Sequence, residues 1–293
     1  MNPEVASNVK AILGEGPSWD AKNEILYWID IRGGVIYSHK PGNPLDQTIA
    51  KAELVSSVVP RAKGGLALTL KHGFYTLDLE SKKSQPLSEP IEANLPRSRF
   101  NDGKCDPAGR YWAGTMDDPE KTPSGSLYCL SKDGKLKKVV TQVIVSNGLG
   151  WSPDNRKMYY IDSPTKKVSS FDYSLQTGEI SNRKTVVDFV PNHQPGDPDG
   201  MTVDAEGMLW VAHWGGSRVT RWDPSNGKLL DTVPVPADET TSLCFAGRNL
   251  DELYITSARD GLDEKTLASK PLAGSLFVVK PGVKGLPTNA YDG

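Results

Sequence analysis

Four side chains that could bind a metal ion recur at one position of a repeated sequence pattern: Glu15, Asn101, Asn147 and Asp199. Each is followed by glycine within two residues and lies five positions ahead of a second repeated residue, in chain order Asp20, Asp106, Ser152 and Asp204. The first four contribute only carboxylate and amide oxygens, without a His or Cys ligand. Such a set suits Ca²⁺, Mg²⁺ or Mn²⁺, whereas Fe²⁺ and Zn²⁺ are less favoured by ligand softness.

Two of these residues, Glu15 and Asp199, carry formal negative charges. Their approach in an enclosed space is costly unless a cation compensates. With Asn147 as a third ligand, the cation would keep open positions for water or substrate, as catalytic metal sites do. The residue types therefore predict a catalytic centre with one divalent ion.

Turn formation is the alternative explanation for Asn101, Asn147 and Asp199. Asn and Asp before glycine are ordinary turn residues, as in NDG, SNG and PDG. Glu15 has no such role, yet it is bracketed by glycines in the segment GEGP. Its recurrence with the other three at one repeat position favours a metal site over turns alone.

The repeated pattern also predicts the fold that would bring these residues together. Each unit has a polar residue, a small apolar strand, a polar turn and an aromatic strand, and the clear copies begin near residues 14, 99, 146, 197 and 240. A fainter copy near residue 58 makes six units at a spacing of roughly 40 to 50 residues, which is typical of four-stranded propeller blades. We therefore expect an all-β, six-bladed β-propeller, in which equivalent positions face one central axis.

The two ends of the chain are expected to complete one blade. Residues 1–293 are predicted to form a single propeller domain. The strand GSLFVVKPGVKG near the C-terminus resembles a second-half strand, GSLYCLSKDGKL, whereas the first blade begins almost at the N-terminus. Pairing between the N- and C-terminal strands would remove an open sheet edge. Deletion of the first ten residues should then destabilise the ring.

Charge and hydropathy exclude several classes of function. The net charge is −2, and the charged residues are evenly scattered, so the sequence predicts neither a nucleic-acid-binding stripe nor a cationic membrane face. No apolar run has transmembrane length, and the N-terminus lacks the apolar core of a signal peptide. The three cysteines, Cys105, Cys129 and Cys244, lack metal spacing. We expect buried thiols in a cytoplasmic protein.

Other polar and aromatic residues are expected to be structural. The histidines show no ligand spacing, and His39, His72 and His193 are expected on the surface or in loops, while His213 could reach the pore mouth. Asp30 and Asp162 end aromatic strands and should make turn or edge hydrogen bonds. The tryptophans should pack between blades. No Ser-His-Asp arrangement or nucleophile elbow is present.

Several motifs resemble those of the gluconolactonase, regucalcin (senescence marker protein) and luciferin-regenerating enzyme family, and most of all its regucalcin members. In chain order they are GEGP (14–17), RFNDGKCDPAGRYWAGTM (99–116), SNGL (146–149), YYIDS (159–163), LQTGEISNR (175–183), PDGM (198–201), DAEGMLWVA (204–212) and ARDGLD (258–263). They span nearly the full chain. The resemblance implies a six-bladed propeller with one catalytic divalent metal in the central pore.

The resemblance also implies roles for individual residues. Glu15, Asn147 and Asp199 match the family's metal ligands, Asn101 matches a residue that holds a metal-bound water or substrate oxygen, and Arg99 matches a substrate-binding arginine. Animal members carry a further substrate-binding glutamate in the loop after GTM. That loop is shorter here, so the role is assigned to none of its three acidic residues, Asp117, Asp118 and Glu120.

The implied activity is metal-dependent hydrolysis of a sugar lactone, D-glucono-1,5-lactone or a related aldonolactone, to the aldonic acid. The metal would polarise the carbonyl, Arg99 and Asn101 would orient the ring, and Asp199 would take a proton from the attacking water. A hydroxide on the metal is the alternative nucleophile. A non-catalytic calcium-binding regulatory propeller and an organophosphate or aryl-ester hydrolase are the alternative functions. The sequence leaves open the oligomeric state and the choice among Ca²⁺, Zn²⁺, Mn²⁺, Mg²⁺ and Fe²⁺.

Overall fold

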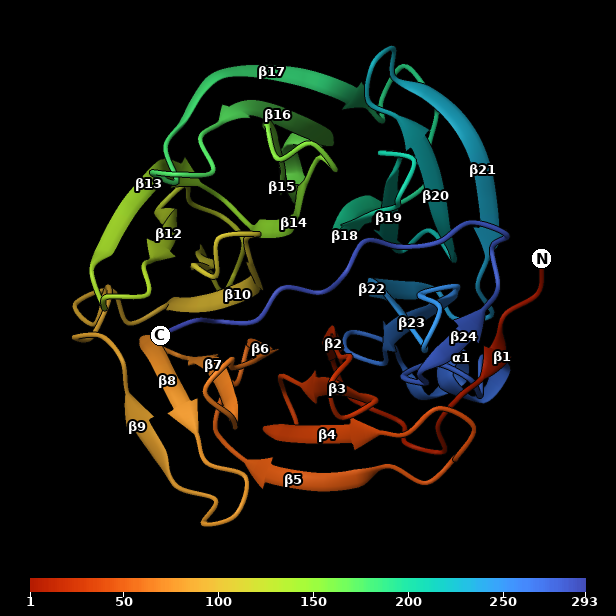
Figure 1. Ribbon diagram of the computed structural model, residues 1–293. Coiled ribbons are helices and arrows are strands. Elements are labelled where there is room, and N and C mark those ends of the chain that lie inside the picture. Colours follow the sequence, from red (N-terminus) through yellow and green to blue (C-terminus); the bar gives the residue numbers. More distant parts are fainter.

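Six four-stranded antiparallel sheets surround a central axis in the computed structural model, which describes residues 1–293 (Figure 1). The predicted six-bladed β-propeller is confirmed. Blade 1 contains β2 (Gly14–Asp20), β3 (Ile25–Asp30), β4 (Val35–His39) and β5 (Gln47–Lys51). Blade 2 contains β6 (Ser57–Pro60), β7 (Leu66–Leu70), β8 (Gly73–Leu77) and β9 (Ser84–Pro86). Blade 3 contains β10 (Ser98–Cys105), β11 (Tyr111–Asp117), β12 (Gly125–Leu130) and β13 (Leu136–Val143).

The remaining blades follow the same order from the axis outward. Blade 4 contains β14 (Ser146–Trp151), β15 (Lys157–Asp162), β16 (Lys167–Tyr173) and β17 (Ile180–Asp188). Blade 5 contains β18 (Asp197–Val203), β19 (Leu209–Trp214), β20 (Arg218–Asp223) and β21 (Lys228–Pro234). Blade 6 contains β22 (Glu239–Ala246), β23 (Glu252–Ala258), β24 (Phe277–Val279) and β1 (Glu4–Val5). The helices are a 3-10 turn, η1 (Ser163–Thr165), and α1 (Glu264–Ser269). Neither has the length and apolar character needed to span a bilayer.

The ring is closed by the two ends of the chain, as expected. The N-terminal strand β1 pairs antiparallel with β24, in the register Glu4 to Val278 and Val5 to Phe277. Two backbone hydrogen bonds extend this contact, from Ala6 N to Leu276 O and from Ala11 N to Gly274 O. Blade 6 therefore takes its outermost strand from the N-terminus, which covers the edge of β24.

Aromatic residues fill the spaces between blades, because the inner faces of neighbouring sheets must bury each other. Trp112 of blade 3 and Trp151 of blade 4 pack edge to face with ring centroids 6.1 Å apart. They belong to a buried cluster that also holds Leu127 and Tyr160. The expected packing of tryptophans between blades is therefore confirmed at this junction.

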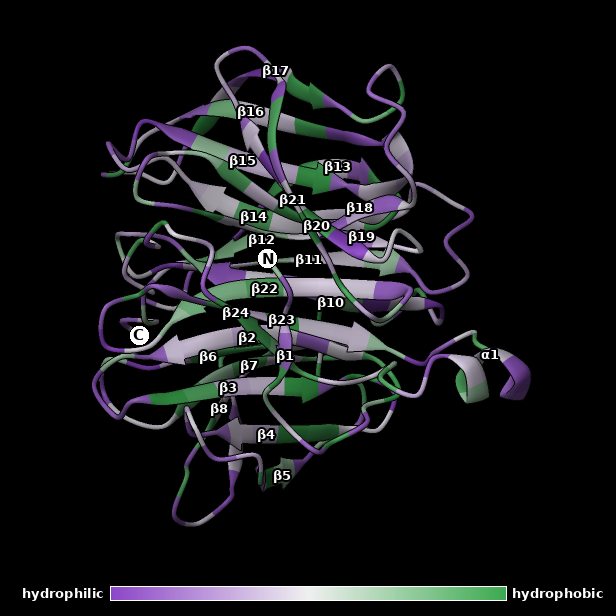
Figure 2. Ribbon diagram, turned by 90° about the vertical axis from the view of Figure 1, so that its right-hand side faces the viewer, coloured by the Kyte–Doolittle hydropathy of each residue, from purple (hydrophilic) through white to green (hydrophobic).

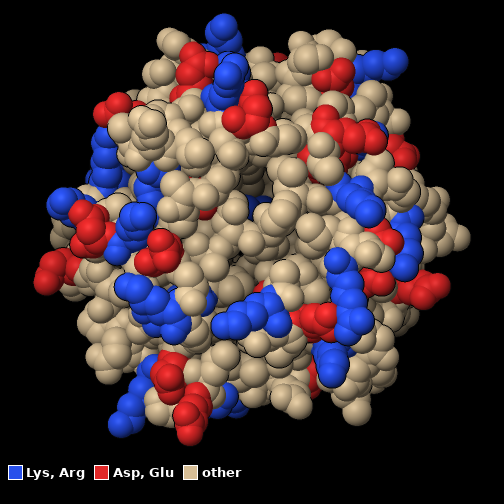
Figure 3. All heavy atoms as spheres, viewed as in Figure 1, with Lys and Arg blue, Asp and Glu red and all other residues tan.

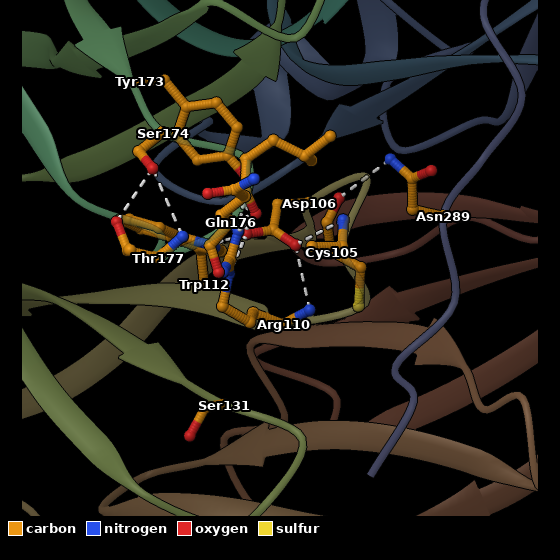
Figure 4. A network of polar contacts seen from close by, with 12 residues as sticks. Cys105, Asp106, Arg110, Trp112, Ser131, Tyr173, Ser174, Gln176, Thr177 and Asn289 are labelled. Carbon is orange, nitrogen blue, oxygen red and sulfur yellow. Dashed lines mark hydrogen bonds and ion pairs between the residues drawn. The ribbon is translucent and has the colours of Figure 1, made fainter.

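Buried aspartates bind neighbouring strands together at the second repeated position. Oδ2 of Asp106 accepts hydrogen bonds from Arg110 Nε (2.6 Å), Trp112 Nε1 (2.8 Å) and the Tyr173 hydroxyl (2.8 Å), as Figure 4 shows. Tyr173 belongs to blade 4, so this carboxylate links two blades. Asp204 likewise accepts hydrogen bonds from a tryptophan indole and an arginine of its own blade. A buried carboxylate is retained here because charged partners satisfy it.

Asp30 and Asp162 make strand-edge hydrogen bonds, as predicted. Asp30 accepts from the backbone N–H groups of Ile12 and Leu13, at 2.8 and 3.0 Å. Asp162 accepts from Val145 N at 3.0 Å and also from the amide before it. These carboxylates attach the incoming chain to the end of a blade and do not face the axis cavity described below. The three cysteines are buried and free, which also agrees with expectation.

Two histidine predictions need correction. His39 is buried, not exposed, because its Nδ1 lies 2.8 Å from Asp46 Oδ1 in a pocket of blade 1. His213 is also fully buried and does not reach the pore mouth. Its ring nitrogens contact Pro195 O (2.9 Å) and Thr220 Oγ1 (2.6 Å), and burial lowers its pKa to about 4.

The two faces of the ring are different. α1 projects from one face, whereas the C-terminus lies at the other (Figure 2). The C-terminal segment, residues 284–293, crosses this second face (Figure 1). Its backbone bonds to Ala205 through Lys284 O and to Pro60 through Tyr291 N, at 2.8 and 2.9 Å. Around this face positive and negative side chains alternate, and uncharged residues surround the central hollow (Figure 3).

Candidate functional site

Five of the six inner strands have a β-bulge that the sequence did not reveal. Register shifts occur in β2, β10, β14, β18 and β22, whereas β6 pairs with β7 without interruption. The shifts fall between the paired residues that bracket Asn101, Asn147 and Asp199, and directly after Glu15. Because a bulge re-aims the side chains beside it, the repeated polar residues leave the normal alternation of the strand.

The glycines after Asn147 and Asp199 allow close packing of the strands. SNG and PDG lie inside β14 and β18, so the turn interpretation is wrong for both. A Cβ on Gly148 would lie 2.6 Å from Met201 Cβ, and one on Gly200 would lie 2.2 Å from Ser242 Oγ. Only glycine fits where the inner strands of adjacent blades approach this closely.

All the predicted site residues line one cavity of about 340 Å³ on the ring axis. They are Glu15, Arg99, Asn101, Asn147 and Asp199, and each is buried. Asp260, which precedes α1 in the chain, lines the same cavity, so the site lies toward the face from which α1 projects (Figure 2). The fold therefore brings the predicted residues together, and their individual roles remain predictions.

The electrostatics of this cavity favour a bound cation. Burial, followed by the charge of Asp102, raises the pKa of Glu15 to about 8. Burial and the charges of Glu15 and Asp102 raise the pKa of Asp199 well above its ordinary value. Asn147 donates through Nδ2 to Ser163 Oγ at 3.0 Å, while its buried Oδ1 has no hydrogen-bond partner. A cation would satisfy this oxygen and compensate both carboxylates.

The donor set depends on this amide. No group of three or more His, Cys, Asp or Glu side chains in the protein is arranged to hold a metal ion. Glu15 and Asp199 offer two carboxylates, and a site here would need a further oxygen, which the unpartnered Oδ1 of Asn147 could supply. An oxygen set of this kind fits Ca²⁺ or another hard cation better than a softer one.

Arg99 and Asn101 form a rigid pair at the wall of the cavity. Arg99 donates from Nε to Asp118 Oδ1 (2.6 Å) and from Nη1 to Asn101 Oδ1 (2.9 Å). Asn101 donates from Nδ2 to Ser146 O (2.8 Å). The amide orientation of Asn101 is therefore fixed by both neighbours, and Arg99 Nη2 makes no hydrogen bond within the protein. The pair can present a cationic donor to a ligand in the cavity.

The three acidic residues of the shortened loop have different places, which the sequence could not distinguish. Asp117 is buried and pairs with Arg97 at 3.0 Å. Asp118 holds Arg99 and also pairs with Arg32 at 3.1 Å. Glu120 lines the cavity, and its own backbone φ is 58°. Burial raises the pKa of its carboxyl group. The sequence motifs assign neither Asp118 nor Glu120 to the site.

Comparisons with known proteins agree with this architecture. Residues 13–259 match the family described as SMP-30/Gluconolactonase/LRE-like region. Regucalcin from Oryctolagus cuniculus is 44% identical over 287 residues, which cover 96% of this chain and 95% of that protein. YvrE of Bacillus subtilis (strain 168), described as a candidate sugar lactone lactonase, is 40% identical over 277 residues, covering 94% of each protein. The structure of regucalcin from Agrobacterium tumefaciens, described as a calcium-binding protein, superimposes with a TM-score of 0.93 at 26% identity, covering 99% of this chain and 97% of that one.

Proposed function

The chain belongs to the SMP-30/gluconolactonase/LRE-like family, and from this premise we propose that it hydrolyses sugar lactones in the cavity around Glu15, Asn147 and Asp199. The observation that carries the proposal is the buried, unpartnered Oδ1 of Asn147 in the same cavity as two buried carboxylates. The proposed substrate is D-glucono-1,5-lactone or a related aldonolactone. Hydrolysis adds water across the ring ester and gives the open aldonic acid.

The same three residues would hold one divalent cation. Ca²⁺ is our first candidate because every protein ligand is an oxygen, with Mg²⁺, Mn²⁺, Fe²⁺ and Zn²⁺ as the other ions to test. When bound, the cation supplies a Lewis acid that polarises the lactone carbonyl and stabilises the negative charge that develops on its oxygen.

The protein side chains would bind and orient the substrate. Arg99 would offer its free Nη2 donor to ring or hydroxyl oxygens, and Asp118 fixes the guanidinium by accepting a hydrogen bond from Nε at 2.6 Å. Asn101, which Ser146 O and Arg99 hold in one orientation, supports this geometry. A group held in advance loses little conformational freedom on binding. The cavity volume, about 340 Å³, lies at the lower end of the range for small-molecule sites and suits a single sugar ring.

Asp199 would act as the general base. A carboxylate oxygen of Asp199 takes a proton from the attacking water as the new C–O bond forms. The same proton passes to the ring oxygen when the ester C–O bond breaks, so no net proton is gained or lost at Asp199. Because burial and the neighbouring carboxylates raise the pKa of Asp199 in the metal-free protein, the bound cation would be needed to keep Asp199 ionised as a base.

A non-catalytic calcium-binding role is the second candidate function. It is favoured by the similarity to the Agrobacterium tumefaciens protein, which is described as calcium-binding. An organophosphate or aryl-ester hydrolase would use the same cavity with a different electrophile. Substrate tests must therefore include a phosphotriester and an aryl ester beside the lactones.

The test measures hydrolysis of glucono-1,5-lactone through the acid that the reaction releases. Metal-stripped protein is used, and each divalent ion is added back separately. We expect activity with at least one ion in the wild type and none in Glu15→Gln. Arg99→Lys is the matched variant, because it should keep the ion and raise KM. Metal binding without activity on any lactone would replace the lactonase with the calcium-binding role, and activity only on the phosphotriester or aryl ester would replace the substrate.

A further inference from the structure

A second cavity of about 270 Å³ lies on the same axis, on the side crossed by the C-terminal segment. It shares no lining residue with the first cavity. Its walls are the residues that follow the site residues along the inner strands, including Asp102 and Lys104 on β10 and Thr202 on β18. Residues 286–289 of the C-terminal segment also line it. The inner strands therefore run from the candidate site to this second cavity, which the C-terminal segment helps to line.

Lys104 spans this part of the pore. Its Nζ donates to Met201 O at 2.6 Å, so the side chain reaches from β10 of blade 3 to β18 of blade 5. It is partly buried and borders the second cavity. Burial lowers its pKa, although the carboxylates of Asp102 and Glu15 act in the opposite direction. A lysine is rarely buried in this way without an acidic partner.

Asp102 is the acidic residue of the same strand, and it lies within the bulge. It is buried, and it lines the second cavity together with Lys104, without an ion pair between the two side chains. Its Oδ1 accepts a hydrogen bond from the backbone N–H of Gly103, at 2.7 Å. Burial raises its pKa, and the charge of Lys104 opposes that shift. Asp102 is thus a third buried carboxylate beside Glu15 and Asp199.

The charges around the axis suggest a division of roles. One divalent cation would compensate the charges of Glu15 and Asp199, so the charge of Asp102 would remain uncompensated. We propose that Lys104 is the fixed counter-charge of Asp102, a positioning residue that lets the pore hold three carboxylates with a single divalent ion. The inference rests on the metal site of the proposed function. Because the two charges have opposite signs, their fields at the metal position would offset each other, and we expect this cancellation to be large.

This cancellation predicts opposite effects for the two single variants. Asp102→Asn leaves the positive charge of Lys104 facing the metal site, so the ion should bind at least about tenfold more weakly. Lys104→Met has nearly the same length without the charge, and it should bind the ion no more weakly than the wild type. In the double variant Asp102→Asn/Lys104→Met, both charges are absent, and affinity should return to within about threefold of the wild type.

The experiment is calorimetric titration with Ca²⁺ and with Mn²⁺ of the wild type, the three variants and Glu15→Gln, after thermal melting has shown which variants fold. Rescue of Asp102→Asn by the second substitution supports the proposal, because a purely structural loss would not be restored by removing another contact. A double variant that binds as weakly as Asp102→Asn would overturn it. A loss of ion affinity greater than threefold in folded Lys104→Met would also overturn the proposal. This variant decides the question if Asp102→Asn does not fold. If neither ion binds the wild type, or if Glu15→Gln binds the ions like the wild type, the metal site of the proposed function is refuted, and the role of Lys104 with it.

Discussion

The inner strands β14 and β6 occupy the same place in two blades, yet only β14 contributes a predicted ligand. β14 has a bulge around Asn147, and the adjacent Gly148 lets β18 approach closely. β6 pairs regularly with β7 from Ser57 to Pro60 and lines only the second cavity, through Val58 and Val59. Site residues are therefore placed where the regular alternation of a strand is interrupted.

A bulge alone does not make a site residue. β22 has the same register shift, but Thr241 at that position donates to Gly14 O at 2.6 Å and contacts Thr256 Oγ1 at 2.8 Å. Its hydroxyl is therefore used to join blade 6 to blade 1. The candidate site requires both the bulge and an oxygen that the protein leaves without a partner, as in Asn147.

The largest effect should come from the charged ligands. Glu15→Gln should reduce lactone hydrolysis at least about a hundredfold, because it removes one of two carboxylates that would hold the ion. Ser57→Ala on β6 is the control. Ser57 bonds to Thr69 and Tyr111 at 2.7 and 2.6 Å, so its loss should lower stability and leave metal affinity unchanged. Calorimetry and initial rates on both variants check the contrast, and equal metal affinity in Glu15→Gln would refute it.

The next effect is loss of stability on deletion of residues 1–10. β1 covers the edge of β24 and closes the ring, so its removal should lower Tm by several degrees. Differential scanning calorimetry would measure the change. The metal-binding residues lie outside the deletion, so calcium affinity measured well below Tm should stay within a few-fold of the full chain. An unchanged Tm would show that β1 does not stabilise the closure.

A smaller but more local effect is expected from glycine substitution. Gly148→Ala should destabilise the protein by about 1–3 kcal/mol, because the new Cβ would meet Met201 Cβ and Asp199 O. It should also weaken metal binding, since both neighbours belong to β18. Gly73→Ala in blade 2 is the matched control, with its nearest contact at 3.3 Å from a tyrosine ring. Chemical denaturation curves that coincide for the two variants would contradict the account.

A further effect is a dependence of stability on pH. The pKa of Glu15 in the folded, metal-free protein is about 8, above its ordinary 4.5, so the folded state holds more protons than the unfolded state between these values. Stability of metal-free protein should therefore fall as pH rises through this window. Added Ca²⁺ should reduce the fall, and Glu15→Gln should flatten it. Melting curves at pH 5 to 8.5, with and without Ca²⁺, would test both statements.

Much of the fold could be predicted from the sequence, because the repeat itself specifies six equivalent blades. The same repeat placed Glu15, Asn147 and Asp199 on one axis without any contact being known. The rest depends on side-chain contacts between distant strands. Lys104 looks like an ordinary surface residue in NDGKC, and only its contact with Met201 reveals that it spans the pore. Likewise, no local pattern reveals that His39 is buried or that Asp118 fixes Arg99.

The most direct test of the central claim is anomalous diffraction from crystals of the protein grown with Mn²⁺. The account predicts one anomalous peak on the axis, at about 2.0–2.6 Å from carboxylate oxygens of Glu15 and Asp199 and from Asn147 Oδ1. The same peak should be absent in Glu15→Gln. A strong peak elsewhere on the protein, or an axis cavity that contains only water at saturating Mn²⁺, would contradict it.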